Sequence, residues 1–378
     1  MNRQYLVTGA IGHLGNTVIR MLLENGSRVR ALVHPDDDIE ALAGLPIELS
    51  YGDVCIKDSM KDFFQVEDPR QTIVIHTAEV ISISDKRDPA IHRVNVQGTV
   101  NVTDMCIKMH IGRLLYVGSA HAIPKKKGAA LIEEVDFFSR DLVEGDYAKS
   151  KAEATQYILS KVKLNVLNAV VVHPSGMIGP NEFGTSAVDN LIREYLSGKL
   201  TSSVRGGYEF VDVRDVAAGI ISAAERGIKG SCYILSNKYI STKSFLNDLH
   251  NITGQKQIKR VFPAWFARRN EKLGGVYFRI LKRPSLHSKY SLFTVFPHSR
   301  FSHERAEHEL FFQTRDMNAS LVDTVSWIEY RRRIDMERMH GKRMEQERLE
   351  RERLEKERLE SERLERERII ARKQIKKK

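Results

Sequence analysis

Thr8-Gly9-Ala10-Ile11-Gly12-His13-Leu14-Gly15 is the stretch that decides the fold of this 378-residue chain. It follows the apolar run Tyr5-Leu6-Val7 and precedes residues 16–24, where apolar side chains recur at helical spacing. A glycine-rich turn between a strand and a helix presents backbone N–H groups at the helix N-terminus, where a diphosphate binds well. Glycine turns also end many strands that bind nothing, so the motif needs support from other residues.

Each glycine of this turn has a predicted use. Gly9 permits the tight turn, Gly12 lets the backbone approach a diphosphate, and Gly15 lets the helix pack close to the strand. The spacing is Gly-x-x-Gly-x-x-Gly and not the more usual Gly-x-Gly-x-x-Gly of dinucleotide-binding turns.

Strand-like and helical segments alternate through the first half of the chain. Continuous apolar runs indicate strands covered on both faces, and their alternation with helices predicts an α/β fold, a Rossmann-type doubly wound parallel sheet. The predicted strands after the first are residues 28–33, 47–49, 72–75, 114–117 and 166–172, and the main helices are 94–109 and 147–160.

After Pro174 this rhythm loosens, which predicts a smaller C-terminal substrate lobe. Its expected elements are helices at 188–196, 213–224 and 243–252, a strand at 231–235, a basic amphipathic stretch at 264–281 and a last helix at 317–330. We therefore expect one domain over 1–330, with 1–173 mainly the dinucleotide-binding core and 174–330 mainly the substrate lobe. Residues 331–378 form a separate tail.

The tail carries most of the charge. Residues 331–378 hold 19 Lys and Arg against 12 Asp and Glu, a net +7 of the total +11, which leaves the body nearly balanced. Leu349, Leu354, Leu359 and Leu364 lie five residues apart, so successive leucines step about 140° around a helix and make no seam. A coiled coil needs apolar residues about every 3.5 positions. We expect an isolated charged helix, as either a solvated appendage or a contact for acidic surfaces or a partner through Lys376-Lys377-Lys378.

Composition excludes several classes of protein. The balanced body argues against specific nucleic-acid binding, and none of the 13 histidines pairs at i,i+4 with a carboxylate ligand nearby, so no metal is expected. Cys55, Cys106 and Cys232 lie far apart, as buried thiols in a reducing compartment do. No apolar run approaches the ~18 residues of a spanning helix, and a strand opens the chain where a signal peptide would stand. These features predict a cytoplasmic protein.

Tyr147 and Lys151 supply the chemistry that the glycine turn lacks. Four residues apart on a predicted helix, they lie on one face, where the ammonium can lower the phenol pKa from its ordinary value near 10. A dinucleotide cradle and a tuned proton donor together indicate redox chemistry on a carbonyl or an alcohol.

Taken together, these motifs resemble the extended branch of the short-chain dehydrogenase/reductase superfamily, the NAD-dependent epimerase/dehydratase family. Within it, the likeness is nearest to dihydroflavonol reductase-like and 3β-hydroxysteroid dehydrogenase-like proteins. It covers residues 1 to about 330. Besides the glycine turn and Tyr147-x-x-x-Lys151, it rests on Gly52-Asp53-Val54, His76-Thr77-Ala78, Asn95-Val96-Gln97-Gly98-Thr99, Pro174-Ser175-Gly176-Met177-Ile178-Gly179-Pro180, Phe210-Val211-Asp212-Val213-Arg214-Asp215-Val216 and Tyr290-Ser291-Leu292-Phe293.

The resemblance implies a role for each matching residue. Tyr147 would donate or accept the substrate proton, Lys151 would lower its pKa and hold the nicotinamide ribose, and Ser119 would hydrogen-bond the substrate oxygen. Asp53 would contact the adenine, and Asn95 would either brace the lysine through water or start a helix. The full cofactor-binding set implied is Gly9, Ile11, Gly12, Gly15, His34, Asp53, Val54, Ala78, Tyr147, Lys151 and Pro174.

The end of the second strand bears on the choice between NAD and NADP. An acidic residue there would bind the ribose 2′-hydroxyl and repel a 2′-phosphate, but this chain has His34. Asp36, Asp37 and Asp38 follow closely and would oppose the phosphate. The sequence favours NADP and leaves NAD open.

Three positions depart from the family pattern. Glu79 replaces the usual glycine beside the nicotinamide pocket, where a carboxylate would crowd the cofactor or alter substrate choice. Gly118 stands where a second hydroxyl is common, and His173 stands where arginine or asparagine is common. Because the catalytic trio is intact, we still expect activity.

The leading hypothesis is an NADP-dependent reductase of a small, fairly apolar carbonyl compound, or the reverse alcohol oxidation, with residues 265–281 covering the substrate. One alternative is a nucleotide-sugar epimerase or dehydratase with tightly bound NAD. Another is a cofactor-binding scaffold whose tail engages a partner. Family members commonly dimerise through helices equivalent to 101–109 and 147–159, which implies a homodimer.

Overall fold

The computed structural model describes residues 3–81, 88–125, 131–184, 186–263 and 300–375. Its centre is a seven-stranded sheet in the order β10-β6-β5-β4-β1-β2-β3, in which every neighbouring pair is parallel. The strands are β1 Gln4–Thr8, β2 Arg28–Val33, β3 Glu48–Tyr51, β4 Ile73–His76, β5 Arg113–Val117, β6 Ala169–Pro174 and β10 Cys232–Leu235. The predicted doubly wound fold is confirmed.

The strand order reverses between β1 and β4, and this reversal places the ligand crevice. β1 pairs with β2 on one side and β4 on the other, so the chain winds outward in both directions from this point. In doubly wound sheets, ligands bind outside the carboxyl ends of the strands at such a switch point. The glycine turn leaves β1 at that edge.

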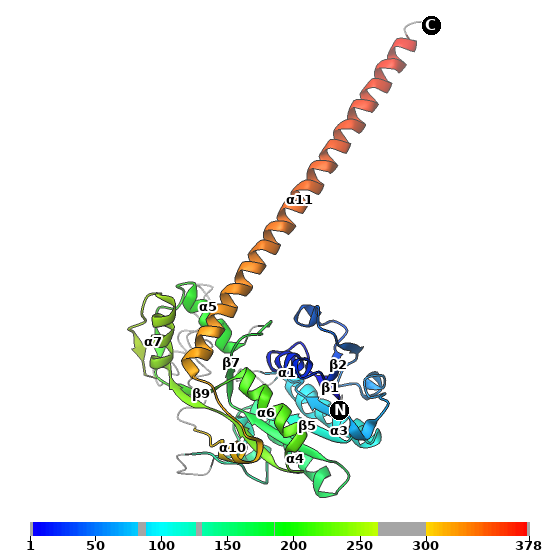
Figure 1. Cartoon of the computed structure of the whole chain (residues 1–378). Helices are drawn as coiled ribbons and strands as arrows, with labels where there is room; N and C mark the ends of the chain where they lie inside the picture. Colours follow the sequence, from blue (N-terminus) through cyan, green and yellow to red (C-terminus); the bar gives the residue numbers. More distant parts are fainter. Residues whose placement is uncertain (1–2, 82–87, 126–130, 185, 264–299, 376–378) are drawn as a thin grey trace. The chain divides into compact units, whose positions relative to one another are not determined.

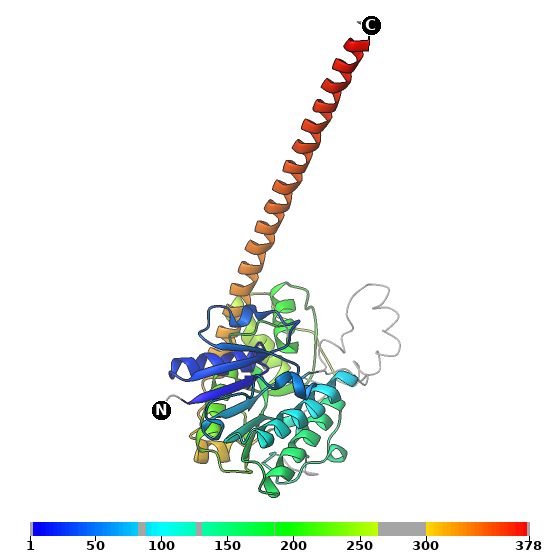
Figure 2. The same ribbon diagram turned by 90° about the vertical axis from the view of Figure 1, so that its right-hand side faces the viewer.

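Helices cover both faces of the sheet (Figures 1 and 2). One buried apolar cluster unites the sheet with α1 His13–Glu24 and α6 Val213–Arg226, and a second unites it with α3 Thr99–Lys108 and α4 Asp146–Lys163. Buried residues on both faces explain why the strands read as continuous apolar runs.

The part of the chain after Pro174 is less separate than predicted. β10 and α6 belong to the central sheet and its cover, since Cys232 of β10 pairs in register with Val171 of β6. The remaining elements there are small. They are β7 Gly176–Ile178, β9 Gly207–Asp212 and β11 Lys238–Ser241 in one sheet, β8 Ser203–Val204 with β12 Val261–Phe262 in another, and the helices α5 Ala187–Leu196, α7 Thr242–Thr253 and α10 Glu304–Leu310.

Two boundaries differ from the sequence prediction for local reasons. The helix expected at 94–109 starts earlier and contains a π-helical segment, Arg93–Gly98, before α3, with the short α2 Pro89–His92 ahead of it. The strand expected from Val166 begins only at Ala169, because Asn165 takes a left-handed conformation and Val166 is exposed. The short 3-10 helices are Ile39–Leu42, Lys57–Met60, Pro69–Gln71, Ala120–Ala122 and Arg140–Leu142.

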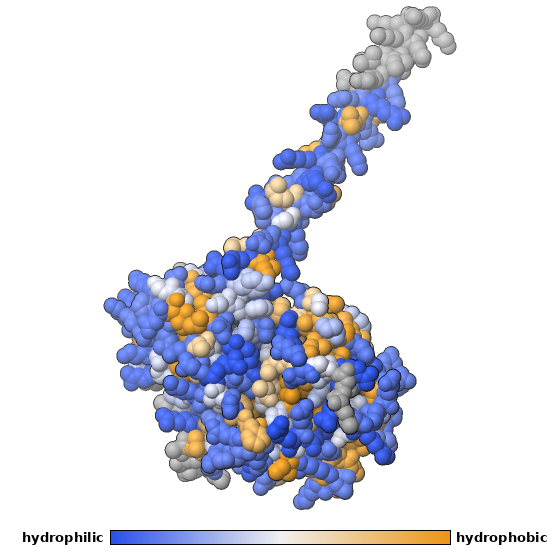
Figure 3. All heavy atoms as spheres, in the orientation of Figure 1, coloured by the Kyte–Doolittle hydropathy of each residue, from blue (hydrophilic) through white to orange (hydrophobic). Residues whose placement is uncertain are grey.

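The predicted last body helix and the tail form one helix, α11, Met317–Ile375. The chain divides into two compact units, 1–325 and 326–378, so the second unit starts five residues before the predicted boundary. Five arginines that lie five residues apart, from Arg343 to Arg363, each pair with the glutamate four residues later, from Arg343–Glu347 at 3.0 Å to Arg363–Glu367 at 3.1 Å. The tail surface is hydrophilic with isolated apolar spots (Figure 3), and its four repeat leucines are each about half exposed.

Some predicted features lie outside the described residues, namely the stretches at 264–281 and 290–293 and the C-terminal Lys376-Lys377-Lys378. In the parts that are described, no helix has the length and apolar character needed to cross a membrane. Nor do three His, Cys, Asp or Glu side chains gather there in a way that would hold a metal ion. All three cysteines are free; Cys106 and Cys232 are buried as predicted, whereas Cys55 is only partly buried.

Candidate functional site

The glycine turn is packed too closely for larger residues. Gly9 has a φ of +70°, and a Cβ built on it would lie 2.6 Å from the backbone nitrogen of Ala78. Gly12 precedes α1 and has no side chain with which to cap it, so the first backbone N–H groups of the helix stay available to an anion. A Cβ on Gly15 would lie 2.2 Å from the Gly9 carbonyl oxygen, so the absence of a side chain allows the start of α1 to lie close against the turn.

Residues after β4 are fixed against this turn by hydrogen bonds. The Thr77 hydroxyl donates to the Thr8 carbonyl at 2.7 Å, and the Ala78 N–H donates to the Thr8 hydroxyl at 3.4 Å. His76 is fully buried between the hydroxyls of Thr8 and Thr99, at 2.7 and 3.0 Å. Ala78 therefore borders the glycine turn, as expected for a residue lining the cofactor site.

His34, Asp53 and Val54 lie together at the far end of the same sheet edge. The His34 Nε2 atom is 3.9 Å from an Asp53 carboxylate oxygen, and its Nδ1 atom is 3.7 Å from Asp36. The Asp53 carboxylate also accepts the N–H of Cys55 at 2.8 Å. Two carboxylates thus face the histidine on which the NADP prediction depends.

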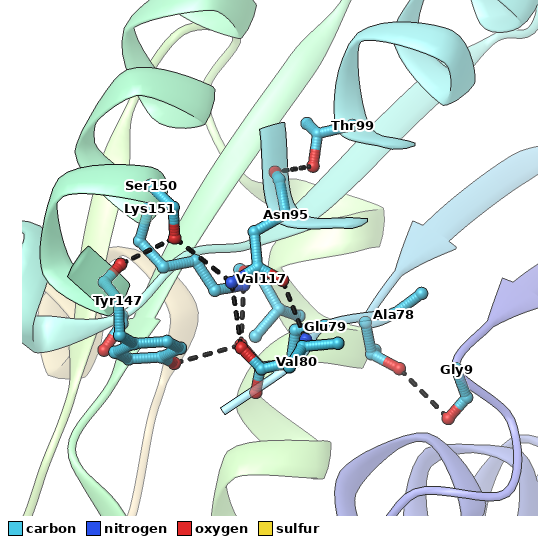
Figure 4. Close-up of polar contacts among 12 residues, drawn as sticks. Gly9, Ala78, Glu79, Val80, Asn95, Thr99, Val117, Tyr147, Ser150 and Lys151 are labelled. Atoms are coloured by element: carbon cyan, nitrogen blue, oxygen red, sulfur yellow. Dashed lines mark hydrogen bonds and ion pairs between the residues drawn. The ribbon is translucent and has the colours of Figure 1, made fainter. Parts of the chain in front are cut away.

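Tyr147 and Lys151 project from the first turns of α4 toward the loop after β4 (Figure 4). The Lys151 side chain is only 1% exposed, and its ammonium donates to the Val117 carbonyl at 2.9 Å. It also pairs with the Glu79 carboxylate at 2.7 Å, and the Tyr147 hydroxyl donates to the same carboxylate at 3.0 Å. The predicted pair is therefore bridged by a third ionisable group.

Burial and this bridge together reverse the pKa shift expected for Tyr147. Burial and then the Glu79 charge raise the pKa of Tyr147 well above 10, while a hydrogen bond with Ser119 opposes the rise. Burial lowers the pKa of Lys151, but Glu79 and Tyr116 together more than offset this and leave that pKa raised. The predicted lowering of the phenol pKa by Lys151 is wrong for this arrangement, because the ammonium is paired with a carboxylate that also faces the phenol.

Ser119 lies two residues after the end of β5, within hydrogen-bonding reach of the Tyr147 side chain. Its hydroxyl accepts the N–H of His121 at 3.3 Å and starts the short helix Ala120–Ala122. The Nδ1 atom of His173 is 3.2 Å from the Ser119 nitrogen and 3.0 Å from its carbonyl oxygen. The serine backbone is therefore held from β6.

Gly118 and His173, two departures from the family pattern, are structurally linked. A Cβ on Gly118 would lie 2.5 Å from the His173 Nδ1 atom, so the absence of a side chain makes room for the ring. The ring is fully buried and stacks on Phe138, with centroids 5.0 Å apart. Its Nε2 atom has no hydrogen-bond partner among the described residues.

Asn95 has a structural role that neither sequence hypothesis named. Its side-chain carbonyl accepts the Val80 N–H at 2.7 Å, and its amide donates to the Val80 carbonyl at 3.0 Å and to Ser150 at 3.1 Å. It lies in the π-helical segment, a local irregularity often found at functional sites. Asn95 thereby holds the segment that carries Glu79 against α4.

Sequence reasoning missed two contacts that enclose the site. His13 contacts the carbonyl oxygen of Pro180 at 2.8 Å and so ties the glycine turn to the Pro174–Pro180 segment. His121 makes a very short hydrogen bond with Tyr208, whose ring lies against Gly176. No local spacing relates these pairs, so only the tertiary structure reveals them.

Most of the sequence-predicted site residues end or follow strands at one edge of the sheet. They are Gly9, Ile11 and Gly12 after β1, His34 after β2, Asp53 and Val54 after β3, Ala78 after β4, Ser119 after β5 and Pro174 at the end of β6. The others lie on helices: Gly15 is in the first turn of α1, and Tyr147 and Lys151 on α4 reach the same edge. This is the edge where a doubly wound sheet binds nucleotides.

Comparison with known proteins agrees with this geometry. A family model described as the NAD dependent epimerase/dehydratase family matches residues 5–235, and the chain belongs to that family. The family predicted from the motifs is therefore confirmed, and with it a class of enzymes that act on small molecules with a nicotinamide dinucleotide.

Relatives extend over nearly the whole body. "Sterol demethylase protein B" of Methylococcus capsulatus is 28% identical over 335 residues, covering 87% of this chain and 99% of the relative. "Putative dihydroflavonol 4-reductase" of Synechocystis is 31% identical over 333 residues, covering 86% and 94%. A nucleoside-diphosphate-sugar epimerase from Pseudomonas aeruginosa shares the fold with a TM-score of 0.70, 21% identity and coverage of 88% and 99%.

Replacing Gly118 with Ser should destabilise the protein by about 1–3 kcal/mol, because the new side chain would collide with the buried His173 ring. Urea denaturation measures this loss of unfolding free energy. In a His173→Asn background the same substitution should cost less than half as much. An equal cost in both backgrounds would show that His173 is not the obstacle.

Buried His76 should make stability fall in acid. Burial lowers its pKa to about 3 from 6.5, so below pH 6.5 the unfolded chain takes up a proton that the folded chain refuses. Stability should therefore decrease toward pH 3, with His76 contributing up to about 1.4 kcal/mol per pH unit. Urea denaturation between pH 7 and 4 should show a shallower slope for His76→Gln. Identical slopes for the wild type and His76→Gln would contradict the assignment.

Proposed function

We propose that this chain is an NAD(P)-dependent oxidoreductase that reduces the carbonyl of a small, fairly apolar molecule or oxidises the corresponding alcohol. The convergence of Tyr147, Lys151 and Ser119 on the sheet edge beside the glycine turn carries the proposal. The free N–H groups at the start of α1 and the close-packed turn fit a dinucleotide diphosphate. The bound nicotinamide would supply or accept the hydride.

The chain's own residues would handle the proton and the oxygen. The Tyr147 hydroxyl is within hydrogen-bonding reach of Ser119 and shares the Glu79 carboxylate with Lys151, so it would protonate the carbonyl oxygen in reduction. The Ser119 hydroxyl would hydrogen-bond that oxygen as charge develops. Lys151, buried and fixed by the Val117 carbonyl, would hold the ribose and stabilise the phenolate that remains.

Two relatives carry names that point to ring-bearing substrates, a sterol and a dihydroflavonol. These names favour a cyclic ketone or alcohol as the substrate class. Dimerisation through α3 and α4, and contact of the tail with acidic surfaces, remain proposals that follow from the sequence.

We propose NAD as the preferred dinucleotide, in place of the NADP that the sequence favours. The argument for NADP needs a positive or neutral surface at His34, but Asp36 and Asp53 lie within 4 Å of its ring. A 2′-phosphate beside these carboxylates would be repelled. The family description also names NAD.

NADH should therefore raise the melting temperature of the protein more than NADPH at equal concentration, because the ligand that binds the folded state more tightly stabilises it more. Thermal-shift titrations with both dinucleotides give the two affinities. Asp36→Asn should reduce the difference between the NADH and NADPH affinities, since it removes one of the two carboxylates beside His34. Tighter binding of NADPH to the wild-type protein would restore the sequence-based preference.

Replacing Tyr147 with Phe should lower turnover by at least about 100-fold, since it removes the proton donor. NADH affinity should stay within about twofold of the wild type, because the phenol does not carry the diphosphate or the ribose. Turnover is measured with a panel of cyclic ketones, and NADH affinity is measured by fluorescence titration. Tyr157→Phe, on the same helix but hydrogen-bonded to Asp104, should keep activity. Unchanged turnover of the Tyr147 variant would reject the mechanism.

Two other outcomes would favour the alternatives. Purified protein with stoichiometric bound NAD would indicate an epimerase or dehydratase, consistent with the family description. Dinucleotide binding without turnover across the ketone panel would indicate a binding scaffold, for which the contact of Glu79 with both Tyr147 and Lys151 gives a structural reason.

A further inference from the structure

Glu79 contacts both Tyr147 and Lys151 at the candidate site. It follows Ala78 in the loop after β4, at the point where the strand order reverses. One of its carboxylate oxygens accepts the Tyr147 hydroxyl at 3.0 Å and pairs with the Lys151 ammonium at 2.7 Å (Figure 4). A single side chain thus engages both groups that the proposed chemistry requires.

The backbone around Glu79 is held on both sides. The preceding residue, Ala78, donates its N–H to the Thr8 hydroxyl. The following residue, Val80, has its N–H and its carbonyl both bonded to the Asn95 amide, at 2.7 and 3.0 Å. The Glu79 side chain is 17% exposed. With the backbone fixed, the part of this contact that can change is the side chain, by rotation toward solvent.

The available donors leave little capacity for another ligand while Glu79 is in place. The Tyr147 hydroxyl has one hydrogen, and it points to Glu79. The Lys151 ammonium has three, of which one goes to Glu79 and one to the backbone carbonyl of Val117. The Tyr116 ring lies 5.1 Å from the same nitrogen. Of these partners, the Val117 carbonyl belongs to a strand and cannot turn away.

We propose that Glu79 is a latch: its carboxylate occupies the Lys151 ammonium and the Tyr147 hydroxyl, and its side chain must rotate away before the site can bind a dinucleotide ribose and a substrate oxygen. This inference rests on the proposed dinucleotide-dependent function. Glu79 acts through Lys151 and Tyr147, and it is therefore a positioning residue and not a catalytic one.

The latch has an electrostatic consequence as well as a steric one. While the carboxylate faces the phenol, it favours the protonated form of Tyr147 and balances the charge of Lys151. Rotation of Glu79 would leave the buried ammonium to act on the phenol directly. Opening the latch therefore frees the ribose-binding group and restores the influence of Lys151 on Tyr147 in one movement.

The first test measures NADH affinity by fluorescence titration of wild type, Glu79→Gln, Glu79→Ala and Glu79→Asp. In the wild type, NADH binding must break the charge-assisted contact between Glu79 and Lys151, and this cost lowers the affinity. Glu79→Gln and Glu79→Ala lack the contact, so they should bind NADH roughly tenfold tighter than wild type. Glu79→Asp keeps the charge but has a shorter side chain, so its NADH affinity should lie between that of the wild type and those of the Gln and Ala variants. The matched control is Glu153→Gln, which removes a carboxylate from α4 that pairs with Arg140, outside the site. It should bind NADH like wild type.

The second test needs no dinucleotide. Alkaline titration of tyrosinate absorbance, with each protein compared with its own Tyr147→Phe derivative, isolates the ionisation of Tyr147. In Glu79→Gln, Tyr147 should ionise at a lower pH than in wild type, whereas Glu153→Gln should not shift it. Circular dichroism confirms that each variant remains folded over the range compared.

The outcomes separate this inference from the proposed function. NADH affinity in Glu79→Gln that equals or falls below the wild-type value would overturn the latch and leave the oxidoreductase proposal standing. An unshifted tyrosinate titration would also overturn it. Failure of every variant to bind NADH or NAD would overturn the proposed function and the latch with it. Tighter binding together with the shifted titration supports both.

Discussion

The site depends on one constraint: a buried ammonium must have a partner. Lys151 is 1% exposed, and a charge taken so far from water is tolerated only when it is paired and hydrogen-bonded. The Val117 carbonyl and the Glu79 carboxylate meet that need. Because the pairing fixes Lys151, it also fixes the face of α4 and the place of Tyr147 one turn before it.

The remaining architecture supplies these partners from different parts of the fold. Val117 comes from β5, Glu79 from the loop after β4, and Asn95 from the π-helical segment that ties this loop to α4. The central sheet brings Val117 and Glu79 to one edge because its seven strands all run in the same direction. The residues of this site are therefore far apart in the sequence and are brought together by the ends of β4 and β5 and by α4.

Much of this edge was predictable from the sequence because it is encoded locally. The strand–turn–helix around Gly9 and the four-residue spacing of Tyr147 and Lys151 need no knowledge of distant contacts. The bridge between Tyr147 and Glu79 joins residues 68 positions apart, and the pairing of β10 with β6 is equally remote, so no spacing reveals either. The expected direction of the Tyr147 pKa shift differs from that in the structure for the same reason, because both its burial and its contact with Glu79 arise only in the folded chain. The continuity of α11 was readable in principle, since no glycine or proline interrupts residues 317–340.

The repeat of α11 makes its length adjustable. Each five-residue unit holds its own ion pair, as Arg348 with Glu352 and Arg353 with Glu357 show. Gaining or losing one unit would extend or shorten the rod by about 7.5 Å and leave every other pair intact. Such a change in helix length would add or remove whole five-residue units and would leave the residues of the candidate site, all within residues 1–325, unchanged.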